Sequence, residues 1–197
     1  MRKDRLPRRR LDVETRRADI LRAAAGAFAV EPYDKVSVAR VAAVAGASEA
    51  LVHRYFGSKS GLYRDVVRAA IDELLRRQRA ADTPAAAPYD RLAVSVRVYL
   101  DAVADAQVGW AAPLRSPAGD VPEAAELRRR TRGLYLALLR DLLALPADPA
   151  LDHALHGYLG FLDAACLSWV ERGCPPAERE PLVAQVVGAI RGALGQS

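Results

Sequence analysis

Apolar residues recur along much of this chain at intervals of three and four positions, which is the spacing of one face of an α-helix. In one long segment they fall four apart, at Leu62, Val66, Ala70 and Leu74. No segment shows the alternation of apolar and polar residues that a half-buried strand would have. The hydrophobic pattern therefore predicts an all-α protein.

Glycine, proline and capping residues divide this pattern into about nine helices. The clearest are expected near residues 15–30, 89–106, 123–145, 150–172 and 177–194. Proline and glycine are frequent in residues 109–122, so we expect that stretch to be irregular.

The predicted helices fall into a small N-terminal unit, residues 15–61, and a larger helical body, residues 62–197. A basic arm, residues 1–14, precedes them, and we expect it to be disordered. The arm carries the net charge of +5, because residues 1–10 hold six basic residues and one acidic residue. A basic arm beside a folded unit indicates contact with a polyanion, and a solvated tail is the alternative.

Residues 37–56 have the pattern of two short helices joined by a tight turn. Ser37 and Ser48 stand where helix N-caps belong, and Gly46 allows the turn a positive φ. Ala42 and Ala45 are small where two helices must cross closely. This is the organisation of a helix-turn-helix, whose second helix enters the major groove of DNA, although other helical hairpins share it.

Three segments around this turn are similar to a known family. They are residues 36–48 (VSVARVAAVAGAS), residues 55–62 (YFGSKSGL) and residues 20–29, which contain ILRAA and AFA. In combination they resemble the TetR family of transcriptional regulators. The resemblance implies a helix-turn-helix DNA-binding domain over residues 15–61, followed by a helical ligand-binding and dimerisation domain.

The expected recognition helix departs from the common TetR sequence at three positions. His53 stands where a tyrosine that contacts phosphate is common, Glu49 where a basic residue is frequent, and Ala50 where glycine or threonine is usual. A ring N–H of His53 could replace the tyrosine contact. Glu49 could accept a hydrogen bond from cytosine N4, or it could face away from DNA.

Eight residues are predicted to contact DNA, each with an ordinary alternative as a helix cap, a core residue or a solvated surface residue. They are Ser37, Arg40, Ser48, Glu49, His53, Arg54, Tyr55 and Lys59. Lys59 opens a helix, where its ammonium group and the helix N-terminus both favour a phosphate. Arg16 and Arg17, near the start of the first expected helix, are weaker candidates.

Large side chains of the body predict a ligand pocket between its helices. The predicted lining residues are Tyr99, Trp110, Leu114, Tyr135, Tyr158 and Phe161. The irregular stretch should pack imperfectly beside them and leave a cavity for a small, mostly hydrophobic effector. The same side chains would fill a solid core equally well.

The last two expected helices carry broad apolar faces, which we predict to pair across a two-fold axis in a homodimer. The predicted interface residues are Leu155, Leu162, Trp169, Val183, Val187 and Ile190. A core buried within one subunit is the alternative.

These features predict a sequence-specific transcriptional regulator that binds double-stranded DNA as a homodimer, namely a repressor released from a palindromic operator by its effector. A constitutive DNA-binding regulator without a ligand is the alternative. An all-helical enzyme is less favoured, because the chain has no phosphate-binding glycine loop, HExxH motif or nucleophile elbow.

No cofactor and no metal ion are expected. His153 and His156 have a spacing that can hold a metal, but no cysteine or carboxylate cluster completes a site beside them. Cys166 and Cys174 imply no disulfide framework. No apolar segment is long enough to span a membrane, so we expect a cytoplasmic protein.

Overall fold

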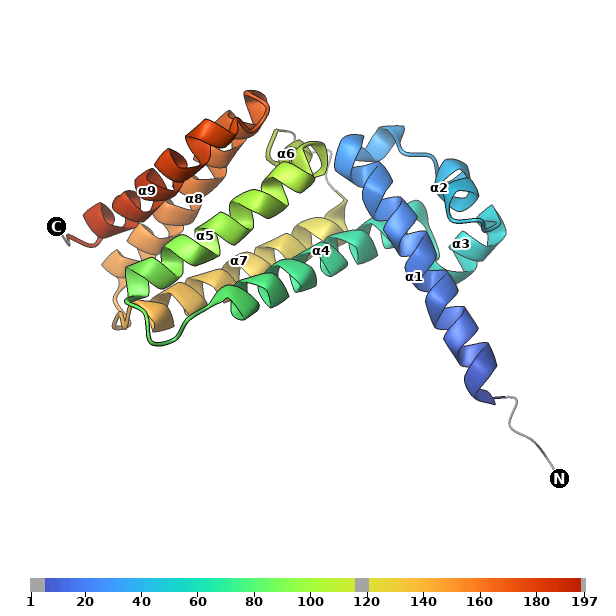
Figure 1. Cartoon of the computed structure of the whole chain (residues 1–197), viewed down its shortest axis with the longest axis horizontal. Helices are drawn as coiled ribbons and strands as arrows, with labels where there is room; N and C mark the ends of the chain where they lie inside the picture. Colours follow the sequence, from blue (N-terminus) through green and yellow to red (C-terminus); the bar gives the residue numbers. More distant parts are fainter. Residues whose placement is uncertain (1–5, 116–120, 196–197) are drawn as a thin grey trace.

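Helices account for nearly all of the described chain, which comprises residues 6–115 and 121–195 of a computed structural model (Figure 1). In these residues there are nine α-helices, one 3₁₀ helix and no strand. They are α1 (Leu6–Val30), η1 (Tyr33–Lys35), α2 (Val38–Val44), α3 (Glu49–Phe56), α4 (Lys59–Ala81), α5 (Pro88–Asp105), α6 (Gln107–Arg115), α7 (Pro122–Leu142), α8 (Pro149–Glu171) and α9 (Pro176–Ala193). The prediction of an all-α fold is confirmed.

The helices form two groups that share α4 (Figure 1). At one end, α1, α2 and α3 pack against the beginning of α4. From there α4 runs alongside α5 and α7 into the body, where α8 and α9 lie on the far side of α5. The helix-turn-helix and α9 therefore occupy opposite ends of the molecule.

The first helix is longer than the sequence pattern predicted. It begins at Leu6, whereas we expected it to begin near residue 15 after a disordered arm. Residues 1–5 of that arm lie outside the described residues, and the remainder is helical. Pro7 lies in the first turn, where the backbone N–H that proline lacks would have no partner within the helix. Arginine also has a high helix propensity, so both features favour the early start of α1.

The prediction of an irregular stretch at residues 109–122 is also wrong in part. Most of its first half belongs to α6, which contains Pro113, and Pro122 begins α7. Residues 116–120 lie outside the described residues. Proline forfeits one helical hydrogen bond, but α6 packs against α1, α5 and α8, and this tertiary packing overrides the weak local propensity.

Serine caps and glycine turns define the helix-turn-helix, and Ser37, Ser48 and Gly46 have the roles predicted for them. Ser37, Ser48 and Ser58 precede α2, α3 and α4, and each accepts a hydrogen bond from the backbone N–H three residues further on, at 3.4, 3.2 and 3.0 Å. Gly46 (φ 61°) and Gly57 (φ 77°) form the turns after α2 and α3. These are left-handed backbone conformations that other residues rarely adopt.

The core of the N-terminal unit continues into the body. Buried residues of α1, α2 and α3 share this core with Leu62, Tyr63 and Val66 of α4 and with Val121 and Ala124 at the start of α7. The boundary that we placed between residues 61 and 62 therefore falls inside α4. The two units share one core, so a shift of α4 or α7 in the body would also move the residues that pack against the helix-turn-helix.

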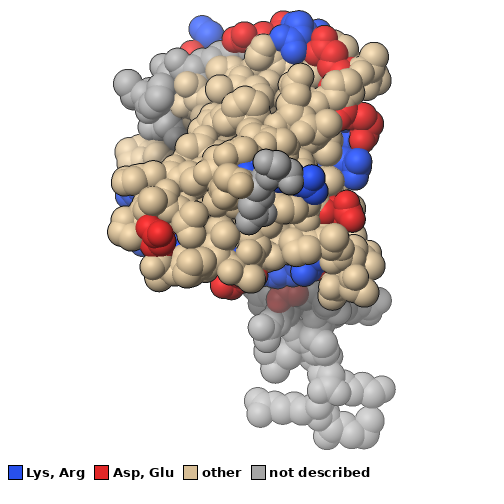
Figure 2. All heavy atoms as spheres, turned by 90° about the vertical axis from the view of Figure 1, so that its left-hand side faces the viewer, with Lys and Arg blue, Asp and Glu red and all other residues tan. Residues whose placement is uncertain are grey.

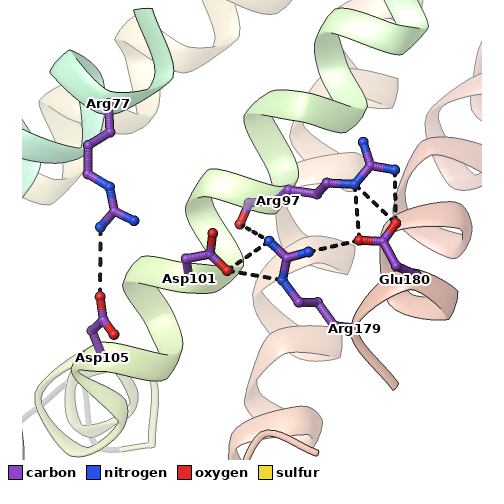
Figure 3. Close-up of polar contacts among 6 residues, drawn as sticks. All are labelled: Arg77, Arg97, Asp101, Asp105, Arg179 and Glu180. Atoms are coloured by element: carbon purple, nitrogen blue, oxygen red, sulfur yellow. Dashed lines mark hydrogen bonds and ion pairs between the residues drawn. The ribbon is translucent and has the colours of Figure 1, made fainter. Parts of the chain in front are cut away.

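A network of partly exposed charges fixes α9 on α5 (Figure 3). The Arg179 guanidinium donates to the Asp101 carboxylate at 2.7 Å and to Glu180 at 2.8 Å. Arg97 donates to Glu180 at 2.9 and 3.0 Å, which lowers the pKa of that carboxyl. Because solvent screens these groups, the network contributes more to the orientation of α9 than to the free energy of unfolding.

Candidate nucleic-acid interface

Helix α3 has an apolar inner face that is buried in the core and a polar outer face that is exposed. Val52 and Phe56 are 1% and 6% exposed, whereas Glu49, His53 and Arg54 are exposed. Arg54 makes no ion pair or hydrogen bond with another described residue. A helix anchored in this way can present its free side chains to base edges in the major groove.

The polar side chains at the beginnings of α2 and α3 are also exposed. Ser37 and Ser48 are surface residues whose hydroxyl oxygens accept the capping hydrogen bonds, which leaves the hydroxyl protons for a phosphate. Arg40 is exposed, and its guanidinium pairs with Glu31 at 2.5 Å. Part of its charge is therefore neutralised in the free protein.

Lys59 stands at the first position of α4, where unpaired backbone N–H groups favour an anion. Its Nζ donates to the backbone carbonyl of Asp34 at 3.3 Å and lies 4.7 Å from the centre of the Tyr33 ring. These contacts hold the ammonium group beside η1. Tyr55 is partly buried and packs edge-on against Phe56, with the ring centres 6.4 Å apart.

Arg16 and Arg17 are exposed residues that connect α1 to neighbouring segments of the unit. Arg16 donates to the carbonyl oxygen of Gly46 at 3.4 Å. Arg17 pairs with Asp65 at 2.6 Å, and its guanidinium lies 4.9 Å from the centre of the Phe56 ring. Since both side chains hold α1 against the turn and against α4, they are less available to DNA than their position in the sequence suggested.

His53 is held between two oxygen atoms. Its Nδ1 lies 3.3 Å from the carbonyl oxygen of Gly57, and its Nε2 lies 3.7 Å from a carboxylate oxygen of Glu49 one turn earlier. The imidazole is about half exposed on the outer face of α3. The sequence pointed to both residues as candidates, but it did not show that they touch.

Four of the six predicted effector residues point into the body. Trp110 Nε1 donates to the Tyr99 hydroxyl at 2.9 Å, and Tyr135 donates to the Gln78 side chain at 2.7 Å. Tyr158 is buried in the core of the body. The structure therefore brings Tyr99 and Trp110 into direct contact, whereas Tyr135 is bonded to α4.

The other two predicted effector residues lie at the surface instead. Leu114 is 39% exposed and Phe161 is 42% exposed. Phe161 shares the outer face of α8 with Gly157 and Gly160, which explains why it does not reach the interior. Two hollows in the described surface lie elsewhere: one of about 580 Å³ is formed mainly by α1 and α2, and one of about 420 Å³ by α4 and α7.

The residues predicted for the dimer interface mostly belong to the subunit's own core. Leu155, Trp169, Val183 and Ile190 are between 0% and 3% exposed, so their side chains cannot form a contact surface. Leu162 and Val187 are partly buried and pack against the same core. The apolar stripes of α8 and α9 face each other and α5, so they are buried within one subunit.

The exposed outer face of α8 and α9 was not among the predicted sites. It carries small residues: Gly157, Gly160 and Ala164 on α8, and Ala184 and Gly188 on α9. Their spacing of three and four was visible in the sequence, but hydrophobicity alone favoured the larger side chains on the opposite face.

Two absences hold for the described part of the chain. No group of three or more His, Cys, Asp or Glu side chains there could hold a metal ion. None of its helices is long and apolar enough to cross a membrane.

Residues 20–66 match the family model described as bacterial regulatory proteins of the tetR family. This match places the similarity to the TetR family in the N-terminal unit. Among curated relatives, the HTH-type transcriptional regulator BetI of Brucella suis biovar 1 is 42% identical over 72 residues, which are 36% of each chain. The alignment therefore spans about a third of the length of that relative.

The whole chain has the fold of solved TetR-family structures. A tetR-family transcriptional regulator from Streptomyces coelicolor gives a TM-score of 0.83 at 24% identity, over 92% of this chain and 81% of that one. FadR from Bacillus subtilis, solved in complex with stearoyl-CoA, gives 0.71 at 16% identity, over 87% and 98%. At such identities the comparison establishes the fold of the TetR-like body and no more.

Proposed function

We propose that this chain is a sequence-specific, DNA-binding transcriptional regulator: a homodimeric repressor that leaves a palindromic operator when a small, mostly hydrophobic effector binds its body. The observation that carries the proposal is α3, which is anchored by Val52 and Phe56 and exposes Glu49, His53 and Arg54. The TetR-family match supports it, because residues 20–66 include this whole helix.

Basic side chains and helix ends would supply the phosphate contacts. Arg54 has no hydrogen-bond or ion-pair partner among the described residues, and Lys59 combines an ammonium group with the N-terminus of α4. The six basic residues among residues 1–10 add charge at the start of the same unit. Contacts of this kind release counterions, so DNA affinity should fall steeply as the salt concentration rises.

A second copy of the chain would cover the outer face of α8 and α9. Figure 2 shows the end of the molecule that carries these helices, and its charged side chains lie mainly near the margin. The exposed residues of this face include Gly160 and Ala164 on α8 and Ala184 and Gly188 on α9. Small side chains let the helices of a partner approach closely, and a two-fold axis would bury the same patch on both subunits.

The effector would be recognised at Tyr99. Burial raises the pKa of the Tyr99 hydroxyl well above its usual range, so the group stays protonated. It accepts a hydrogen bond from Trp110, but no described residue accepts its own proton. An interior donor without an acceptor favours a ligand that supplies one, such as the carbonyl or carboxylate oxygen of an otherwise apolar molecule.

The DNA-binding proposal is tested with the full-length chain. Duplexes are selected from a random-sequence pool, and the affinity for the selected site is compared with that for a scrambled duplex of equal composition. We expect a palindromic site and a preference of about 10³-fold or more. Equal affinity for both duplexes would overturn the proposal.

The effector proposal is tested by release from that operator. Stearoyl-CoA is the first compound to try, because it was found with FadR, and a panel of apolar carboxylates, ketones and amines follows. An effector should release the DNA and raise the melting temperature of the free protein, and Tyr99→Phe should weaken both effects. If no compound does either, the chain is a constitutive regulator.

A further inference from the structure

Lys59 lies over the first of two tyrosine rings, Tyr33 and Tyr63, that connect it to α7 of the body. We propose, on the basis of the proposed DNA-binding function, that these rings position the Lys59 ammonium group for a DNA phosphate and that Arg128 of α7 holds them in place. The affinity for the operator then depends on a residue of the body, outside the helix-turn-helix.

The first link holds the ammonium group itself. Lys59 Nζ donates to the backbone carbonyl of Asp34 at 3.3 Å and lies 4.7 Å from the centre of the Tyr33 ring, whose negative face attracts a cation. An ammonium group has three N–H donors, so donors remain for a phosphate. A lysine side chain is flexible, and holding it in one place beforehand reduces the entropy that is lost when DNA binds.

The second link places the Tyr33 ring. Its centre lies 5.2 Å from the centre of the Tyr63 ring, and the two rings are tilted by 54°. The Tyr63 ring in turn lies 4.8 Å from the ring of Phe28, and both of these side chains are buried in the core of the N-terminal unit. Tilted aromatic pairs at such distances attract each other. The position of the partly buried Tyr33 ring therefore depends on where Tyr63 lies.

The third link joins the rings to the body. Arg128 of α7 donates to the Tyr63 hydroxyl at 2.8 Å, and its guanidinium lies 5.7 Å from the centre of the same ring. Glu123, in the first turn of α7, acts on the other ring: burial raises the pKa of the Tyr33 hydroxyl, and the negative charge of Glu123 raises it further. Two residues of α7 thus act on the two tyrosines, so a displacement of α7 would move the support of Lys59.

The experiment compares operator affinity in two backgrounds, the wild type and Lys59→Ala, by fluorescence anisotropy at one salt concentration. Tyr33→Leu removes the ring beneath the ammonium group. In the wild-type background we expect about a tenfold loss, or roughly threefold at each of two half-sites. In the Lys59→Ala background the same substitution should cause no further loss, because there is no ammonium group to position. A purely structural role for Tyr33 would weaken binding equally in both backgrounds.

Three further variants test the links separately. Tyr33→Phe keeps the ring and should restore most of the affinity that Tyr33→Leu loses. Arg128→Met keeps an unbranched side chain but removes the donor, and it should weaken binding by roughly threefold, again only when Lys59 is present. Tyr89→Leu is the matched control: this ring lies 4.3 Å from the Arg191 guanidinium, between α5 and α9, and its loss should leave operator affinity unchanged.

The outcomes distinguish this inference from the proposed function. If the wild type prefers a selected operator but Tyr33→Leu or Arg128→Met binds it equally well, the positioning role alone is overturned. Equal losses in both backgrounds, or an unchanged affinity in Lys59→Ala, have the same consequence. A wild type that prefers no duplex over its scramble overturns both. If Tyr33→Leu loses its helical circular dichroism, Arg128→Met carries the test, because Arg128 is partly exposed.

Discussion

Gly109 allows α6 to cross α1 at backbone distance. A Cβ atom at this position would lie 2.4 Å from the carbonyl oxygen of Phe28 and 3.5 Å from the Cα of Ala29. Both atoms belong to the backbone of α1, so neither can rotate away. Gly109→Ala should therefore separate α6 from α1 and disturb the packing of the N-terminal unit against the body.

The size of the effect follows from this overlap. Non-bonded heavy atoms settle near about 3.5 Å, so the two helices would have to separate by about 1 Å. Overpacking of this kind costs about 1–3 kcal/mol. Replacing glycine by alanine within a helix otherwise gains at most about 1 kcal/mol. We expect a net loss of up to about 2.5 kcal/mol in the free energy of unfolding, or up to about 10 °C in Tm for a chain of this size.

The assay is urea unfolding followed by circular dichroism at one fixed protein concentration. Gly133→Ala on α7 is the matched control, because an added Cβ there meets no atom within 4 Å. This control should gain about 0.5–1 kcal/mol from the helix-propensity difference. The gap between the two variants then isolates the contact between α6 and α1.

Gly109→Ala should also change operator affinity, because the same contact positions α1 of the N-terminal unit against the body. A Gly109→Ala protein that matches Gly133→Ala in unfolding midpoint and keeps wild-type DNA affinity would refute the close crossing of α6 and α1.

Lys59→Ala should weaken binding to every duplex and reduce the slope of log K against log salt concentration by about 0.9 for each phosphate lost, whereas an unchanged slope would show that Lys59 touches no phosphate. Ala184→Glu should turn the homodimer into a folded monomer in light scattering at micromolar concentration; a wild type that is already monomeric would contradict the interface. Burial raises the pKa of the Cys166 thiol to about 12. This thiol should therefore stay protonated and resist alkylation at pH 8 until urea unfolds the protein, and rapid labelling of the native chain would count against its burial. Ser48→Ala removes the cap of α3 and should lower the free energy of unfolding by about 1 kcal/mol, a prediction that an unchanged midpoint would exclude.

The sequence by itself determined the features that arise from neighbours along the chain. The serine at position 48 and the glycine at position 46 set the start of α3 and the turn before it, because a cap and a left-handed turn involve atoms only a few residues apart. Helical periodicity gave the class of fold, and the structure buries Val52 and Phe56 on the inner side of the recognition helix. The exposed face of that helix follows from the same spacing.

Only the tertiary structure decided what covers each apolar stripe. The pattern of α8 and α9 showed that Leu155 and Ile190 had to be buried, but a stripe looks the same whether its cover is the same subunit or a second one. Packing across the body likewise made α6 helical despite Pro113 and turned Phe161 outward. The two oxygen contacts of His53 needed the ring to be placed in space, because its chemistry lies in the distances to Gly57 and Glu49 and not in the identity of the residue.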